Sequence, residues 1–153
     1  MLLVPAVSHA QALPFVAAET DAASLGTAGA GLVETSSVAD ASFSNAAVIP
    51  FSDNKLDASV GYTMWQPSSS NILNVGVAYN VKSKFGVALG VHYGMNPSYD
   101  VTNESGAVAG VFAPKDIHVN AGLAWRFLPF LSLGANIGYA TSSLAEGHSY
   151  GAL

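Results

Sequence analysis

The chain has 153 residues, enough for one domain, with ten acidic and five basic residues and a formal net charge of −5. Charged residues make up 10% of it, against about a quarter in ordinary globular domains, and the mean hydropathy is +0.37. The basic residues form no cluster, which excludes nucleic-acid binding through a basic patch. The lack of cysteine excludes disulfides, thiolate metal sites and a cysteine nucleophile.

Residues 1–12 resemble the end of a secretory signal peptide. The apolar start is followed by Ala10-Gln11-Ala12, which fits an A-x-A cleavage site, although the positively charged n-region is missing. The alternative is a short apolar N-terminal arm. We expect a signal peptide remnant over 1–12, which indicates an exported protein.

Residues 13–54 are rich in alanine, glycine and serine. Gly26, Gly29 and Gly31 have the spacing G-x-x-G-x-G and lack the preceding strand and following acid of a dinucleotide-binding loop. Small residues permit close approach of backbones. We therefore expect 13–54 to form a compact plug inside a confined space such as a barrel lumen, with a flexible linker as the alternative.

Five later stretches alternate between apolar residues and polar or small ones. They lie at 55–64, 73–81, 85–95, 115–127 and 131–140. This period of two is typical of a strand with one face in an apolar environment. Strands in soluble proteins are usually about 5–6 residues long, and the chain has no run of about 18 apolar residues that would form a spanning helix. The pattern predicts an all-β fold, an antiparallel up-and-down transmembrane β-barrel.

The links between these strands predict an orientation. Those at 82–84 and 128–130 are tight, whereas 96–114 is a long polar excursion at the opposite end. Outer-membrane barrels have short periplasmic turns and longer outer loops, so the tight turns should face the periplasm. Aromatic residues on the apolar faces are expected to form interfacial girdles; they are Tyr62, Tyr79, Tyr93, Trp125 and Tyr139.

About five strands are too few for a barrel, because natural single-chain barrels have about eight or more. Residues 149–153 look like a loop, and an open strand edge is not tolerated in lipid. We therefore expect 55–153 to be the first strands of a truncated barrel.

The order of these features resembles the PorV/PorQ branch of the FadL-like outer-membrane barrel family. The Gly-rich stretch 24–31 is followed by Phe43 and Asn45, which match the family's aromatic-x-Asn-Pro-Ala motif, with Ala46 where proline is usual. The segment 130–139 is similar to family strands that follow a periplasmic turn. The resemblance implies a larger barrel with an N-terminal plug in the outer membrane of a Gram-negative cell.

The same resemblance implies two functions. PorV-type members carry cargo proteins in type IX secretion, together with other secretion components, and FadL-type members move long hydrophobic molecules inward. Our leading hypothesis is a non-enzymatic PorV/PorQ-like protein that contacts outer-membrane lipid and secreted cargo. The alternative is a FadL-like transporter of a hydrophobic small molecule.

A third hypothesis is a soluble β-sandwich that binds a partner. It predicts a dry core containing Leu89, Val91, Leu123 and Trp125, which the barrel would instead turn toward lipid.

Polar side chains on the less apolar strand faces are expected to line the lumen. They are Asp57, His92, His118, Asn120 and Arg126. We expect the two histidines to be hydrogen-bonded; a metal pair is the alternative. The chain has no nucleophile-elbow motif, and we expect no catalytic, cofactor or metal residues and no enzymatic activity.

Overall fold

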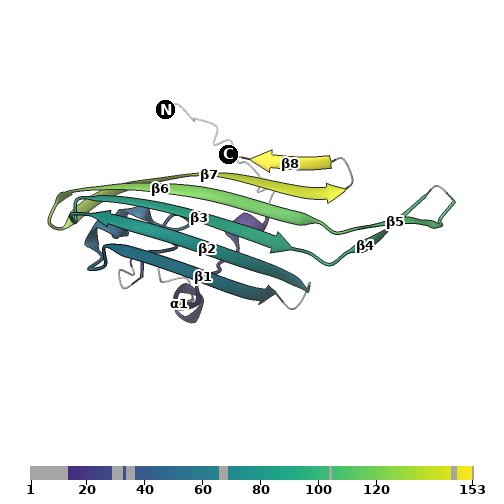
Figure 1. The fold of residues 1–153 in the computed structure, drawn as a ribbon, viewed down its shortest axis with the longest axis horizontal. Helices are drawn as coiled ribbons and strands as arrows, with labels where there is room; N and C mark the ends of the chain where they lie inside the picture. The colour runs from purple at the N-terminus through teal and green to yellow at the C-terminus, as the bar shows by residue number, and fades with distance from the viewer. Residues whose placement is uncertain are drawn as a thin grey trace, which may run out of the picture.

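A computed structural model of the chain describes residues 14–28, 33, 37–65, 69–103, 105–145 and 148–152. These residues form one antiparallel sheet of six strands in the order β1-β2-β3-β6-β7-β8 and a separate hairpin, β4-β5 (Figure 1). The expected signal peptide remnant, Gly29 and Gly31 lie outside the described residues.

The short helical segments before the sheet whose bounds lie among the described residues are η1 (Pro14–Ala17), α1 (Ala22–Gly26) and η3 (Ala46–Phe51). The strands are β1 (Leu56–Trp65), β2 (Ser70–Val81), β3 (Phe85–Met95), β4 (Tyr99–Thr102), β5 (Val108–Phe112), β6 (Lys115–Leu128), β7 (Leu131–Ala145) and β8 (His148–Ala152). No helix among the described residues is long and apolar enough to cross a membrane.

The five long strands predicted from the alternation are confirmed as β1, β2, β3, β6 and β7. Their pairing is antiparallel and follows chain order, except that β3 pairs with β6. The two tight turns lie at the same end of the sheet, where Arg126 N–H donates to Lys84 O at 2.8 Å. The all-β, antiparallel expectation therefore holds.

Two of the remaining segments contain strands that the sequence pattern did not predict. The excursion 96–114 contains the hairpin β4-β5, because Asn103 closes its turn by accepting hydrogen bonds from Ser105 N at 3.1 Å and Ala107 N at 3.0 Å. The loop-like end contains β8, which pairs with the end of β7. The sheet holds six strands rather than about five and is open, since β1 and β8 each pair with one described strand.

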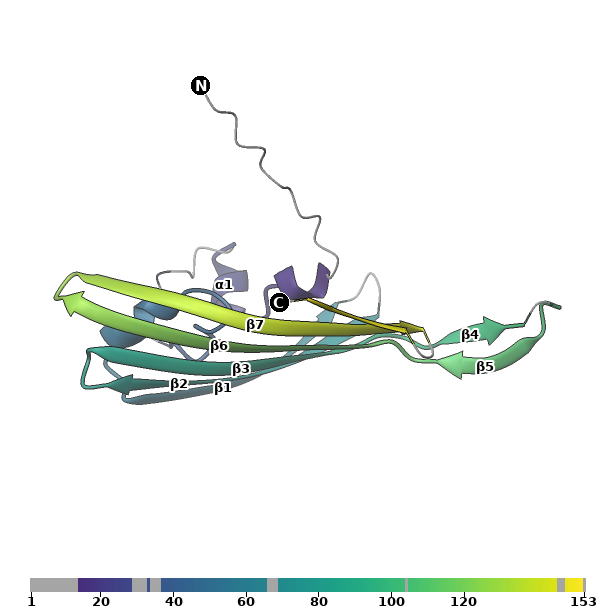
Figure 2. The same cartoon turned by 90° about the horizontal axis from the view of Figure 1, so that it is seen from above.

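The two faces of this sheet differ sharply in what they contact. Residues 37–51, which we call the covering segment, lie against one face, which we call the inner face. Figure 2 shows the helical segments on that side of the sheet and no described element over the opposite, outer face. The main contact is a small apolar cluster in which Val38, Ala41 and Ile49 meet Ala78 and Ala88.

Glycines on the inner face allow this close contact. A Cβ atom at Gly76 would lie 2.5 Å from Ala39 O, and one at Gly134 would lie 2.4 Å from Ala47 N. A Cβ atom at Gly90 would lie 2.1 Å from the Phe43 ring. These glycines of β2, β3 and β7 leave the space that the covering segment fills, which we call the groove.

Candidate functional site

The centre of the inner face holds an aromatic and imidazole cluster. His92 of β3 and His118 of β6 are direct cross-strand partners, with ring centroids 5.8 Å apart. Phe43 of the covering segment stacks on His92 at 3.6 Å and meets the His118 ring edge at 5.4 Å. Thr20 Oγ1 lies 3.1 Å from His92 Nε2. The cluster thus joins two strands to two parts of the N-terminal region.

Among the described residues, the Thr20–His92 pair has no third member that would complete a catalytic triad. Such a triad needs a group that orients the imidazole through its other nitrogen. His92 Nδ1 is buried and has no hydrogen-bond partner in the part of the chain that the structure describes, and the same is true of His118 Nδ1. The described residues contain no group of three or more histidine, aspartate or glutamate side chains that could hold a metal ion.

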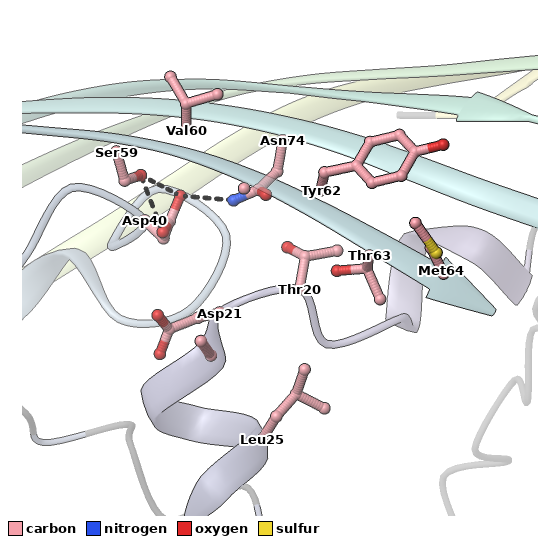
Figure 3. A pocket seen from close by; sticks show the side chains of 12 residues that line it. Thr20, Asp21, Leu25, Asp40, Ser59, Val60, Tyr62, Thr63, Met64 and Asn74 are labelled. Carbon is pink, nitrogen blue, oxygen red and sulfur yellow. Dashed lines mark hydrogen bonds between the residues drawn. The ribbon is translucent and has the colours of Figure 1, made fainter.

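A second polar cluster lies where the covering segment passes β1 and β2. The Asp40 carboxylate accepts hydrogen bonds from Ser59 Oγ at 3.0 and 2.9 Å and from Asn74 Nδ2 at 3.3 Å. Burial raises the pKa of Asp40, and the two hydrogen bonds oppose that rise only in part. A pocket of about 400 Å³ opens beside this carboxylate (Figure 3).

Arg126 fixes the covering segment at the tight-turn end. Its guanidinium lies 4.4 Å from the centroid of the Phe51 ring and donates from Nη1 to Pro50 O at 3.4 Å. The same group donates to Leu128 O at 3.3 Å and to Pro129 O in the β6–β7 turn. One side chain therefore joins the end of η3 to a turn of the sheet.

A buried carboxylate occupies the opposite end of the sheet. Asp116 is 8% exposed and accepts hydrogen bonds from Asn96 Nδ2 at 2.7 Å and from Ser142 Oγ. Ser70 Oγ donates to Asn96 Oδ1 at 2.9 Å. The network spans β2, the end of β3, β6 and β7, and sequence reasoning did not predict it.

Of the other predicted site residues, Asn120 lies beside His118, since a Cβ atom at Gly138 would be 2.8 Å from His118 Nε2 and 3.0 Å from Asn120 Oδ1, whereas Asp57, Asn45 and Gly26 lie elsewhere. Asp57 accepts from Asn54 Nδ2 at 2.8 Å, close to the start of β1, and Asn120 is buried, with no described residue bonded to its Oδ1. Asn45 caps η3 by accepting from Ala47 N at 3.1 Å. Gly26 ends α1 in open space, where a Cβ atom would meet nothing within 4 Å.

The structure thus brings together Phe43, His92 and His118 from the residues expected to be functional. Thr20 joins this cluster, and Asp40 and Asn74 form the second one; the sequence did not single out these three residues as binding groups. For Asn74 the sequence signal was its position on the strand face that also carries glycine; Thr20 and Asp40 precede the strands and had no such signal. Comparison with protein-family models, with curated proteins and with solved structures found no match for this chain.

Proposed function

We propose that this chain forms part of the wall of an outer-membrane β-barrel, with its covering segment inside the lumen, and that it acts without catalysis. The observation that carries the proposal is the outer face of the sheet. Large apolar side chains there are widely exposed, with fractions of 58% for Leu89, 64% for Leu123 and 65% for Leu133. A continuous exposed apolar surface of this kind marks a contact with another molecule or with a membrane.

Strand length supports lipid as that contact. β3 has 11 residues, which at about 3.3 Å each gives roughly 36 Å. A tilt near 40° reduces the height to about 28 Å, enough for the apolar band of about 25 Å in outer-membrane barrels. The longer strands β6 and β7, of 14 and 15 residues, exceed this requirement.

Aromatic residues on the outer face also support a membrane contact. Tyr62, Trp125 and Tyr139 are each exposed by 53 or 54%. Trp125 lies 6.3 Å from the Phe85 ring, beside the tight-turn end of the sheet. Tyrosine and tryptophan favour the interface between lipid and water, because their rings are apolar and carry one polar group.

The β-sandwich hypothesis fits the structure less well. It needs Leu89, Val91, Leu123 and Trp125 in a dry core, yet their exposed fractions are 58, 41, 64 and 54%. No second layer among the described residues covers them (Figure 2).

For the role of the barrel, we propose a PorV/PorQ-like part in type IX protein secretion, which rests on the resemblance in sequence. A FadL-like passage for hydrophobic molecules is the second candidate. It is less favoured because the inner face presents buried Asn74, Asn80 and Asn120 together with two histidines, and because the covering segment fits into glycine positions.

Cell fractionation tests the barrel. We expect the product of the complete reading frame in the outer-membrane fraction, with a gel mobility that changes on heating. A soluble product with no heat-dependent shift would contradict both the barrel and the proposed family.

Deletion of the gene separates the two roles. We expect proteins with type IX C-terminal signals to fail to reach the cell surface, while uptake of long-chain fatty acid stays unchanged. The reverse result would favour the transporter.

A further inference from the structure

Basic residues gather at one end of the sheet. Of the five lysine and arginine residues in the chain, four lie at the tight-turn end: Lys55 just before β1, Lys82 and Lys84 in the β2–β3 turn, and Arg126 near the end of β6. The fifth, Lys115, begins β6 at the end that carries the β4-β5 hairpin (Figure 1). A chain with a net charge of −5 thus has one end that is locally basic.

The three lysines at the tight-turn end are exposed to their surroundings, whereas Arg126 is half-buried and donates to backbone carbonyl groups. Two carboxylates lie at this end among the described residues. Asp57 is half-buried and bonded to Asn54, and Asp53 is exposed. The exposed lysines therefore outnumber the exposed carboxylates, and the surface here is positive.

These lysines border exposed aromatic side chains on the outer face. Phe85, next to Lys84 in the chain, stacks on its cross-strand partner Trp125 with ring centroids 6.3 Å apart, and the two residues are 51 and 54% exposed. Lys55 Nζ lies 5.9 Å from the centroid of the Tyr79 ring, which places its charge beside the outer face. The outer face thus changes from apolar to aromatic and then to cationic toward the tight turns.

This order of groups fits one leaflet of a bilayer. Apolar side chains suit acyl chains, and tyrosine and tryptophan favour the interface between lipid and water. Lysine can lay its apolar stem along the interface and extend its charge to the headgroups. Charge complementarity selects anionic headgroups, because each lysine near a negatively charged leaflet strengthens binding by about fivefold.

We propose that the tight-turn end of the outer face binds anionic phospholipid. Headgroup phosphates lie against Lys55, Lys82 and Lys84, and the acyl chains lie against Phe85 and Trp125. The inference rests on the proposed barrel, since it needs the outer face in lipid. It adds a preference for one class of lipid, in the leaflet that the tight turns face.

Fluorescence quenching by brominated lipid tests this preference. Trp65→Phe leaves Trp125 as the sole tryptophan. This protein is placed in vesicles of equal parts phosphatidylglycerol and phosphatidylcholine, with bromine on the acyl chains of one lipid or the other. We expect phosphatidylglycerol to bind beside Trp125 about fivefold more tightly than phosphatidylcholine. High salt should lower this ratio, because it screens exposed charges.

Lysine substitutions in the same background assign the preference to the tight-turn end. Lys82→Gln combined with Lys84→Gln should lower the ratio to less than about twofold, and Lys55→Gln should lower it in part. Lys115→Gln is the matched control, because it removes the same charge from an exposed lysine at the opposite end, and it should leave the ratio unchanged. Quenching in vesicles of brominated phosphatidylcholine alone checks that each variant is inserted.

The outcomes distinguish this inference from the barrel itself. Equal binding of the two lipids overturns the preference and leaves the barrel in place. The same holds for a ratio that the paired substitution leaves unchanged, or that Lys115→Gln lowers equally. Absence of Trp125 quenching by either lipid contradicts the lipid contact of the outer face, and the inference then fails with the barrel.

Discussion

Phe43 stacks on His92 with ring centroids 3.6 Å apart and an interplanar angle of 18°. The phenylalanine belongs to the covering segment, and the histidine belongs to β3. Because His92 is also the cross-strand partner of His118, this one ring contacts two neighbouring strands. Through this contact the covering segment packs directly against β3 and β6 on the inner face of the sheet.

Phe43→Ala should therefore loosen the covering segment. We expect a loss of about 2–3 kcal/mol, below the full range for a buried phenylalanine because the side chain is only half-buried. The measurement is the unfolding midpoint in detergent. Phe130→Ala is the matched control, since Phe130 is 78% exposed in the β6–β7 turn and should change stability by less than about 0.5 kcal/mol. Equal losses in the two variants would contradict the account.

Gly134→Ala tests the groove. Its Cβ atom would fall 2.4 Å from Ala47 N and 3.0 Å from Ala46 C, and backbone atoms cannot move aside as a side-chain tip can. Overpacking of this kind costs about 1–3 kcal/mol. Gly110→Ala on β5 meets nothing within 4 Å and should leave stability nearly unchanged. Limited proteolysis of the two variants would show whether the covering segment has been displaced, as we expect only for Gly134→Ala.

Arg126→Lys should weaken the attachment of η3 to the β6–β7 turn. Lysine keeps the charge but cannot reproduce the planar fork that reaches Pro50 O, Leu128 O and the Phe51 ring together. We expect a loss of about 1–2 kcal/mol, of the size of a hydrogen bond to a charged group. A chemical-denaturation curve identical to that of the unaltered protein would contradict this, because it would show that a positive charge alone attaches η3 to the turn.

The hairpin should be removable. β4 and β5 pair only with each other among the described residues and extend beyond the ends of β3 and β6 (Figure 1). Replacing residues 99–112 with a short glycine-containing turn should leave outer-membrane assembly and the heat-dependent gel shift intact. Loss of either would mean that the hairpin contributes to the fold of the sheet.

Much of the fold follows from alternation alone. The strands β2, β3 and β6 alternate between more and less exposed positions over most of their length. Their large apolar residues fall on the outer face, apart from Ile72, which is buried, and Leu128, which follows the register shift at the end of β6. Period two sets which residues share a face, so the pattern also predicted which side chains lie on the inner face.

The hairpin and β8 were missed because they are too short to show a period. β4 has four residues and β5 five, with a bulge between Val101 and Thr102 that breaks the alternation. The turn signal was visible in Asn103 and Gly106, which has a φ of +79°. β8 also has five residues and pairs with the extended end of β7.

The candidate site was only partly predictable. The histidines could be placed on one face, but their contact with Phe43, about 50 residues earlier than His92, depends on where the covering segment enters the groove. The bond between Asn74 and Asp40 depends on the same placement. Such contacts between distant segments leave no local pattern in the sequence.

The central claim is that the outer face contacts lipid, and a spin-label scan along β3 tests it directly. The chain has no cysteine, so single cysteines can be introduced at 87–92 and labelled without background. In outer-membrane vesicles, oxygen should speed the spin relaxation of labels at Val87, Leu89 and Val91, and a water-soluble nickel complex should have little effect on it. Labels at the inner-face positions between them should show low access to oxygen. Equal access along the strand, or nickel access at Leu89 and Val91, would contradict the account.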